Sequence, residues 1–60
     1  MKNAERASAT RARLIAVARR MFGEQGYAGT ATEAVLQEAG VARGAMYHHF
    51  ADKAALFEAV

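Results

Sequence analysis

The large apolar residues between positions 11 and 25 recur at the spacing of one face of an α-helix. They follow the i, i+3, i+4, i+7 repeat of an amphipathic helix, and they are Leu14, Ile15, Val17, Ala18, Met21 and Phe22. Gly26 follows this stripe, and glycine readily takes the left-handed conformation in which many helices end. The pattern predicts a helix over about residues 10–25, with Ser8 or Thr10 as its N-terminal cap.

Two shorter helical segments follow, and a glycine separates them. The hydroxyl of Thr30 or Thr32 can accept an unpaired amide hydrogen bond at the start of a helix over about residues 32–39. Gly40 is placed to end that helix, and the apolar pattern resumes with Met46 and Phe50 in a helix over about residues 43–50. Two short helices joined by a tight glycine turn form a helix-turn-helix.

A fourth helix is expected over about residues 53–60, with Asp52 as its cap. The chain has no proline and is rich in alanine, which favours helix throughout. We therefore predict an all-α fold, in which a three-helix helix-turn-helix domain is followed by the start of a fourth helix. This domain covers residues 10–60, and a basic N-terminal arm covers residues 1–9.

Positive charge is concentrated in the first third of the chain. Residues 1–20 contain six basic side chains and one acidic one, whereas residues 21–60 contain two basic and five acidic side chains. Such a basic segment is typical of binding to a polyanion, either nucleic acid or an anionic membrane surface. A solvated helix start of the same composition is the alternative interpretation, and Arg19 and Arg20 are expected on a solvated helix face.

Several classes of protein do not fit this sequence. Cysteine is absent, whereas small secreted domains are usually stapled by disulfides. No apolar run approaches the roughly 20 residues of a membrane-spanning helix, and the N-terminus lacks the apolar core of a signal peptide. We therefore expect a cytoplasmic protein that does not enter a membrane.

Catalytic and metal chemistry are also disfavoured. Sixty residues leave no room for a separate catalytic domain, and no base is predicted near the hydroxyls of Ser8 and Thr10. His48 and His49 point about 100° apart on a helix, and no cysteine or suitably spaced carboxylate completes a ligand set with them. We expect no enzymatic activity, no metal and no cofactor.

The outer face of the third predicted helix carries the residues best suited to reading DNA. Val35, Ala39, Val41, Met46 and Phe50 are expected to pack inward, which leaves outward the set Arg43, Gly44, Ala45, Tyr47 and His48. Arginine can fork onto guanine or clamp a phosphate, and an alanine methyl can touch thymine, while glycine permits close approach. A helix also fits the major groove of double-stranded DNA.

Other side chains are candidate phosphate ligands. The Tyr47 hydroxyl and a ring nitrogen of His48 or His49 can donate hydrogen bonds to phosphate, and Lys53 lies in the first turn of the fourth predicted helix, where amides can also face an anion. Arg11 and Arg13 have two interpretations, as solvated side chains or as phosphate ligands. The structural alternative for Tyr47 is a packed aromatic ring with its hydroxyl in water.

Two blocks of sequence carry a family resemblance. The first is MYHHF at Met46–Phe50, and the second is the Asp52, Lys53 and Leu56 that follow it. Further matching features are the helix end at Phe22–Gly26, the threonines before the helix at 32–39, AGV at Ala39–Val41, and Gly44 two residues before Met46. From Leu14 to Leu56 the chain thus resembles the N-terminal DNA-binding domain of the TetR family of bacterial transcriptional regulators.

The resemblance implies sequence-specific binding of double-stranded DNA through the helix at 43–50, as part of a transcriptional regulator that is most often a repressor. It implies base or backbone contacts from Arg43, Gly44, Ala45, Tyr47 and His48, and phosphate or capping roles for Thr30, Thr32, His49 and Lys53. It further implies a homodimer on a palindromic operator. Dimerisation and binding of a small-molecule effector would belong to a C-terminal domain that these 60 residues do not contain.

Two positions depart from the family pattern. Ala42 stands where a helix-capping serine is common, which predicts a weaker start to the third helix. Leu36 stands where a small residue usually lets the second and third helices approach, which predicts a slightly different crossing. The competing hypothesis is a protein or membrane interaction module, in which the apolar stripe of the basic first helix docks on a partner or on anionic lipid.

Overall fold

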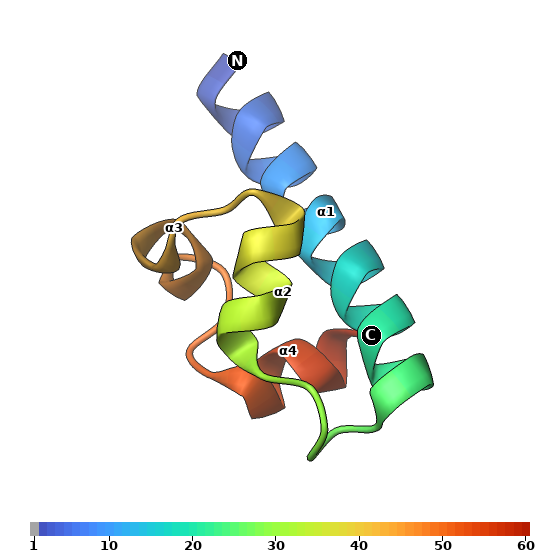
Figure 1. The fold of residues 1–60 in the computed structure, drawn as a ribbon. Helices are drawn as coiled ribbons and strands as arrows, with labels where there is room; N and C mark the ends of the chain where they lie inside the picture. The colour runs from blue at the N-terminus through green and yellow to red at the C-terminus, as the bar shows by residue number, and fades with distance from the viewer. Residues whose placement is uncertain (1) are drawn as a thin grey trace.

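The protein is an all-helical domain, as the sequence predicts. The computed structural model describes the backbone of residues 2–60 and the side chains from residue 6 onward. Within this range it contains four helices and no strand: α1 (Lys2–Gln25), α2 (Thr32–Ala39), α3 (Arg43–Tyr47) and α4 (Lys53–Ala59) (Figure 1). None of these helices is both long and apolar enough to cross a membrane.

One hydrophobic core joins all four helices. Helices α2 and α4 pack on the C-terminal half of α1, while the N-terminal half of α1 projects beyond them (Figure 1). The buried apolar residues are Leu14, Ala18, Met21, Phe22, Val35, Leu36, Ala39, Met46, Phe50 and Leu56. The expected inward packing of the helix-turn-helix is therefore confirmed, except that Val41 lies at the edge of the core and is only partly buried.

Helix α1 begins earlier than predicted. It starts at Lys2 instead of near residue 10, so residues 2–9 of the predicted basic arm are helical, and residue 1 lies outside the described residues. Ser8 and Thr10 lie inside the helix and do not cap its start. The physical reason is the high helix propensity of alanine, lysine, glutamate and arginine, which make up most of residues 2–9 and outweigh the preference of two hydroxyl residues for a cap.

The helix-turn-helix turn is built as predicted around Gly40. Gly40 has φ +69°, a conformation that glycine adopts without steric cost, and so confirms its place at the end of α2. The amide of Gly40 donates to Gln37 at 3.3 Å, and the amide of Val41 donates to Leu36 at 3.0 Å. This pair of bonds is a Schellman motif, and it satisfies two carbonyl groups in the last turn of α2.

Helix α3 is shorter than predicted. It ends at Tyr47 instead of near residue 50, because the next two amides bond three residues back instead of four, before the Phe50 amide returns to a bond four residues back, with the Met46 carbonyl at 2.8 Å. His48 donates to Ala45 at 3.3 Å and His49 to Met46 at 2.8 Å. The tighter turn ends the α-helix and brings Phe50 into the core. At the other end, Ala42 provides no side-chain cap, as expected from the sequence.

Helix α4 starts where the sequence places it. The Asp52 carboxylate accepts a hydrogen bond from the Ala55 amide at 2.9 Å, which confirms Asp52 as the cap. In the loop between α1 and α2, Tyr27 folds back against the core, and its ring centroid lies 5.7 Å from that of Phe22 and 5.0 Å from that of Phe57. These aromatic contacts join the end of α1 to α4.

Candidate nucleic-acid interface

Helix α3 has one buried residue and a mostly exposed opposite surface. Met46 is fully buried and holds the helix on the core. The exposed residues are Arg43, Gly44, Tyr47 and His48, and the exposed fraction of Tyr47 is 51%. Ala45 and His49 are half-buried beside them. Of the predicted outward set, four residues are therefore exposed, on α3 or directly after it, and Ala45 is half-buried.

Arg43 is held by a residue that the sequence analysis did not select. Its guanidinium group forms an ion pair with the carboxylate of Glu33, which lies in the first turn of α2. Both side chains remain accessible, at 58% for Arg43 and 70% for Glu33. The two residues are separated by most of a helix and a turn, so no periodic pattern in the sequence brings them together.

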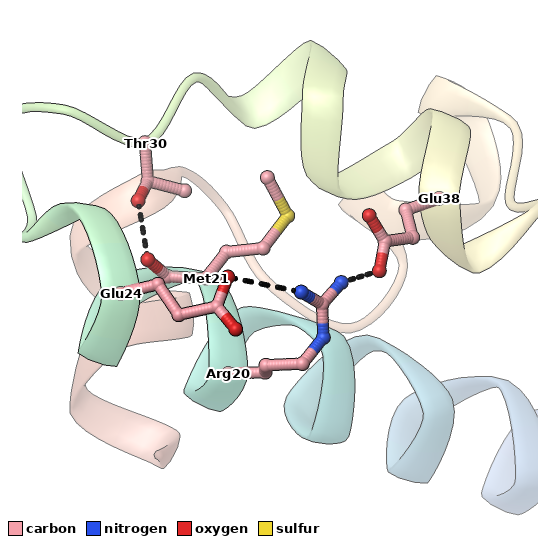
Figure 2. A network of polar contacts seen from close by, with 5 residues as sticks. All are labelled: Arg20, Met21, Glu24, Thr30 and Glu38. Atoms are coloured by element: carbon pink, nitrogen blue, oxygen red, sulfur yellow. Dashed lines mark hydrogen bonds and ion pairs between the residues drawn. The ribbon is translucent and has the colours of Figure 1, made fainter.

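Thr30 does not lie in an interface. The residue is completely buried, and its hydroxyl lies 3.1 Å from the carbonyl oxygen of Met21 and 2.8 Å from that of Gly26, to either of which it can donate (Figure 2 shows the contact with Met21). The N-cap of α2 is Ala31, which provides no side-chain hydrogen bond. The predicted roles of Thr30 in capping α2 and binding phosphate are therefore wrong for this conformation, because its only hydroxyl serves the end of α1.

Thr32 occupies a different position from the predicted cap. It is the first residue of α2 and is half-buried. The first intrahelical bonds of α2 are donated by Ala34 and Val35 to the carbonyl of Ala31. The amides of Thr32 and Glu33 precede them, at the position where helices leave their amides free of intrahelical partners. Thr32 is thus placed to offer a hydroxyl or an amide to an anion, without acting as a cap.

Lys53 has a structural role that the sequence analysis missed. Its ammonium group donates to the carbonyl oxygens of Tyr27 and Thr30, both at 2.8 Å, and lies 4.3 Å from the centroid of the Tyr27 ring. The side chain therefore joins the start of α4 to the loop between α1 and α2. A lysine ammonium has three donors, so one remains for a phosphate, and the predicted phosphate contact of Lys53 stays a prediction.

The basic helix α1 meets the end of the helix-turn-helix. The guanidinium carbon of Arg11 lies 5.3 Å from the centroid of the Phe50 ring, a cation–π contact. Arg6 and Arg13 are exposed on the same helix. The contact places at least one positive charge of α1 beside the residues that follow α3. His49 lies in the same region, with its ring centroid 6.3 Å from that of Phe50.

A second ion-pair network lies between α1 and α2. Arg20 pairs with Glu24 at 3.1 Å within α1, and also with Glu38 on α2 (Figure 2). The expected position of Arg20 on a solvated face is right in that its side chain is 46% exposed, but the side chain also links two helices. The carboxylates of α2 are thus divided between two arginines, with Glu33 facing α3 and Glu38 facing α1.

Comparison with known proteins gives one consistent answer. The family model described as bacterial regulatory proteins, tetR family, matches residues 14–60. The chain is 41% identical over 59 residues to the HTH-type transcriptional regulator AcrR of Shigella flexneri, and 45% identical over 56 residues to the HTH-type transcriptional regulator TtgR of Pseudomonas putida. It is 43% identical over 53 residues to an HTH-type transcriptional repressor of Mycobacterium tuberculosis.

These alignments cover almost all of this chain but only part of each relative. They include 98%, 93% and 88% of the 60 residues, respectively. The same alignments cover 27%, 27% and 28% of the relatives. The chain therefore spans about a quarter of the length of the curated relatives that it matches.

Proposed function

This chain belongs to the tetR family of bacterial regulatory proteins, as a helix-turn-helix DNA-binding domain, and we propose that it binds DNA by placing α3 in the major groove. The observation that carries the proposal is the division of α3 into a buried Met46 and an exposed surface formed by Arg43, Gly44 and Tyr47, with exposed His48 directly after the helix. A helix held to the core by one side and bare on the other can enter a groove without unfolding the domain.

Each exposed residue of α3 has a chemical role in this proposal. Arg43 donates to base edges, since the guanidinium fork matches the two acceptors of guanine in the major groove. Gly44 lets the helix approach the bases closely, and Ala45 offers a methyl group. Tyr47 and His48 donate to phosphate oxygens and fix the register of the helix on the duplex.

Residues outside α3 supply further phosphate contacts. One DNA strand is contacted by Thr32 at the start of α2 and by the third donor of Lys53. The duplex beyond the end of α3 is contacted by His49 and Arg11. Thr30 supports this arrangement indirectly, because its hydroxyl holds the end of α1 and its carbonyl accepts from Lys53. These contacts carry affinity and not sequence information.

The intact regulator would act as a homodimer on a palindromic operator in the cytoplasm, most often as a repressor. The support for this part is the family membership and the named relatives, which are transcriptional regulators and a repressor. Two-fold symmetry of the protein is matched by two-fold symmetry of the operator. The effector-binding site and the dimer interface would be formed by residues outside this chain.

The alternative as a lipid- or partner-docking module conflicts with the packing of α1. That function needs the apolar stripe of the helix to be accessible. Leu14 and Ala18 are fully buried, and Met21 and Phe22 are buried at 5% and 7% exposure. The stripe is already used by the core, so docking through it would require the domain to open.

The test is selection of binding sequences from a random pool of double-stranded DNA at two salt concentrations. The wild-type chain, Tyr47→Ala and Tyr47→Phe are compared, with circular dichroism to verify that each variant folds. We expect wild type to enrich a half-site, Tyr47→Ala to lose most of that enrichment, and Tyr47→Phe to lose less because it retains the ring. Salt-sensitive binding without enrichment, equal in all three chains, would show that positive charge alone binds DNA and would refute the proposal.

A further inference from the structure

The ion pair between Glu33 and Arg43 joins the first turns of the two helices of the helix-turn-helix. Glu33 is the second residue of α2 and Arg43 is the first residue of α3. Arg43 opens the exposed surface of α3 that the proposed function places in the major groove. A carboxylate therefore lies directly beside the cation assigned to base reading, on a surface that approaches a polyanion.

The pair has little to contribute to folding. Both side chains are more than half exposed, at 58% and 70%, and exposed pairs of this kind are weak because water screens them. Removal of either partner also leaves no buried charge behind. What Glu33 contributes to folding comes from its place in the first turn of α2, where a carboxylate interacts favourably with the helix N-terminus, and not from the pair with Arg43.

The contact leaves most of the Arg43 guanidinium free. Glu33 accepts from one terminal nitrogen of Arg43, whereas the guanidinium group has five N–H donors in a planar fork. Two of the remaining donors are enough for the two acceptors of guanine. A single carboxylate contact can therefore fix the orientation of the fork without consuming the donors that read the base.

The charge of Glu33 acts in the same direction. A phosphate that approaches Arg43 also approaches the Glu33 carboxylate, and the two anions repel each other. A base edge carries no net charge and suffers no such repulsion. Glu33 therefore disfavours use of Arg43 as a phosphate clamp, which is the contact available on any DNA sequence.

We propose that Glu33 is a specificity-determining residue, which positions Arg43 for a base edge and weakens binding to DNA of unrelated sequence. The inference rests on the proposed function, because it assumes that α3 enters the major groove. Glu33 does not itself touch the base in this scheme. It acts through the orientation of Arg43 and through its own negative charge.

The chain contains a matched control on the same helix. Glu38 also lies on α2 and also pairs with an arginine, but its partner is Arg20 of α1 (Figure 2). Glu33→Gln and Glu38→Gln remove the same charge and the same kind of contact. Only the first change acts on Arg43.

The experiment compares the wild-type chain, Glu33→Gln, Glu38→Gln, Arg43→Ala and the double variant Glu33→Gln with Arg43→Ala. Each is selected against the random pool, and its affinity for the enriched half-site and for unrelated duplex is titrated by fluorescence anisotropy over a series of salt concentrations. Arg43→Ala identifies the base pair that Arg43 reads, as the position at which preference is lost.

We expect Glu33→Gln to bind unrelated DNA about two- to fivefold more tightly, and to lose preference at the base pair identified by Arg43→Ala while keeping it elsewhere. The salt dependence of nonspecific binding should steepen by about one contact. Glu38→Gln should retain the wild-type preference at that base pair. In the double variant, Glu33→Gln should have no further effect on that position, because the residue acts through Arg43.

Three results would overturn the inference. The first is an unchanged preference in Glu33→Gln while wild type enriches a half-site. The second is an equal change in Glu38→Gln, which would show an effect of overall charge. The third is an Arg43→Ala chain that retains every base preference, which would remove Arg43 from base reading. Absence of any enriched half-site in wild type would instead refute the proposed function itself.

Discussion

The ammonium group of Lys53 donates a hydrogen bond at 2.8 Å to the backbone carbonyl of Thr30, and this bond ties the start of α4 to the loop before α2. A second bond of the same length reaches the carbonyl of Tyr27. Backbone carbonyls in a loop need hydrogen-bond partners when they are shielded from water. Lys53 supplies these partners across 23 and 26 residues of sequence.

Lys53→Met should therefore destabilise the domain as well as weaken DNA binding. The substitution keeps the aliphatic stem and removes both charge-assisted bonds, so we expect a loss of about 1–2 kcal/mol in the free energy of unfolding. Urea unfolding followed by circular dichroism measures this loss. Arg19→Met removes one positive charge from the exposed surface of α1 and serves as the control. Unchanged stability in Lys53→Met would show that the two bonds do not form in solution.

Thr30→Val should affect stability and leave the DNA-reading surface intact. The change replaces a buried hydroxyl by a methyl group of similar shape and removes the bond to the end of α1, at a cost of about 1 kcal/mol. Thr32→Val is the matched control, since it makes the same change at the start of α2. We expect the Thr32 variant to unfold like wild type and to bind DNA more weakly. The opposite division between the two threonines would contradict these assignments.

Gly44→Ala should separate folding from binding. A Cβ atom at this position would meet no other atom within 4 Å, so the change should stabilise α3 slightly through the higher helix propensity of alanine, by up to about 1 kcal/mol. The same methyl group would stand between α3 and the bases, and DNA affinity should fall. Gly23→Ala lies in equally open space on α1 and should gain stability without losing affinity. Equal affinity of both variants would show that Gly44 does not approach DNA closely.

Gly40→Ala should weaken the turn between α2 and α3. Gly40 has φ +69°, and an L-residue with a Cβ atom pays about 1 kcal/mol or more there. We expect a lower midpoint of thermal unfolding, by roughly 4–8 °C for each kcal/mol in a domain of this size. Gly40→Asn should lose less, since asparagine tolerates the left-handed region better than alanine. A Gly40→Ala variant that unfolds at the wild-type temperature would contradict the turn geometry.

Features that depend on local sequence were predictable. The apolar repeat of α1, the glycines at positions 26 and 40, and the Asp52 cap all express preferences of a residue and its near neighbours, and the structure has them. The start of α1 was misplaced because Ser8 suggested a cap within a segment whose alanines and arginines favour helix. The end of α3 was misplaced because the apolar pattern continues to Phe50, while the amides of His48 and His49 already bond three residues back and end the α-helix at Tyr47.

Features that depend on contacts across the chain were not predictable. Arg43 was selected from its chemistry, but its partner Glu33 becomes visible only once α2 and α3 are folded against each other. Thr30 reads as a helix cap in the sequence, and its burial against the end of α1 follows from the path of the loop. The single sequence thus identified the exposed residues of α3 better than it identified the residues that contact them.

The length of α3 limits how much of a DNA sequence one copy of this chain can address. Five residues rise about 7.5 Å along a helix, which corresponds to about two steps of base pairs at 3.4 Å each. A DNA site of so few base pairs recurs by chance at short intervals in any genome, where competing sites number roughly a million or more. Selective binding at one operator must therefore depend on a second copy of the chain, bound at a fixed spacing, or on the shape of the DNA between the two half-sites.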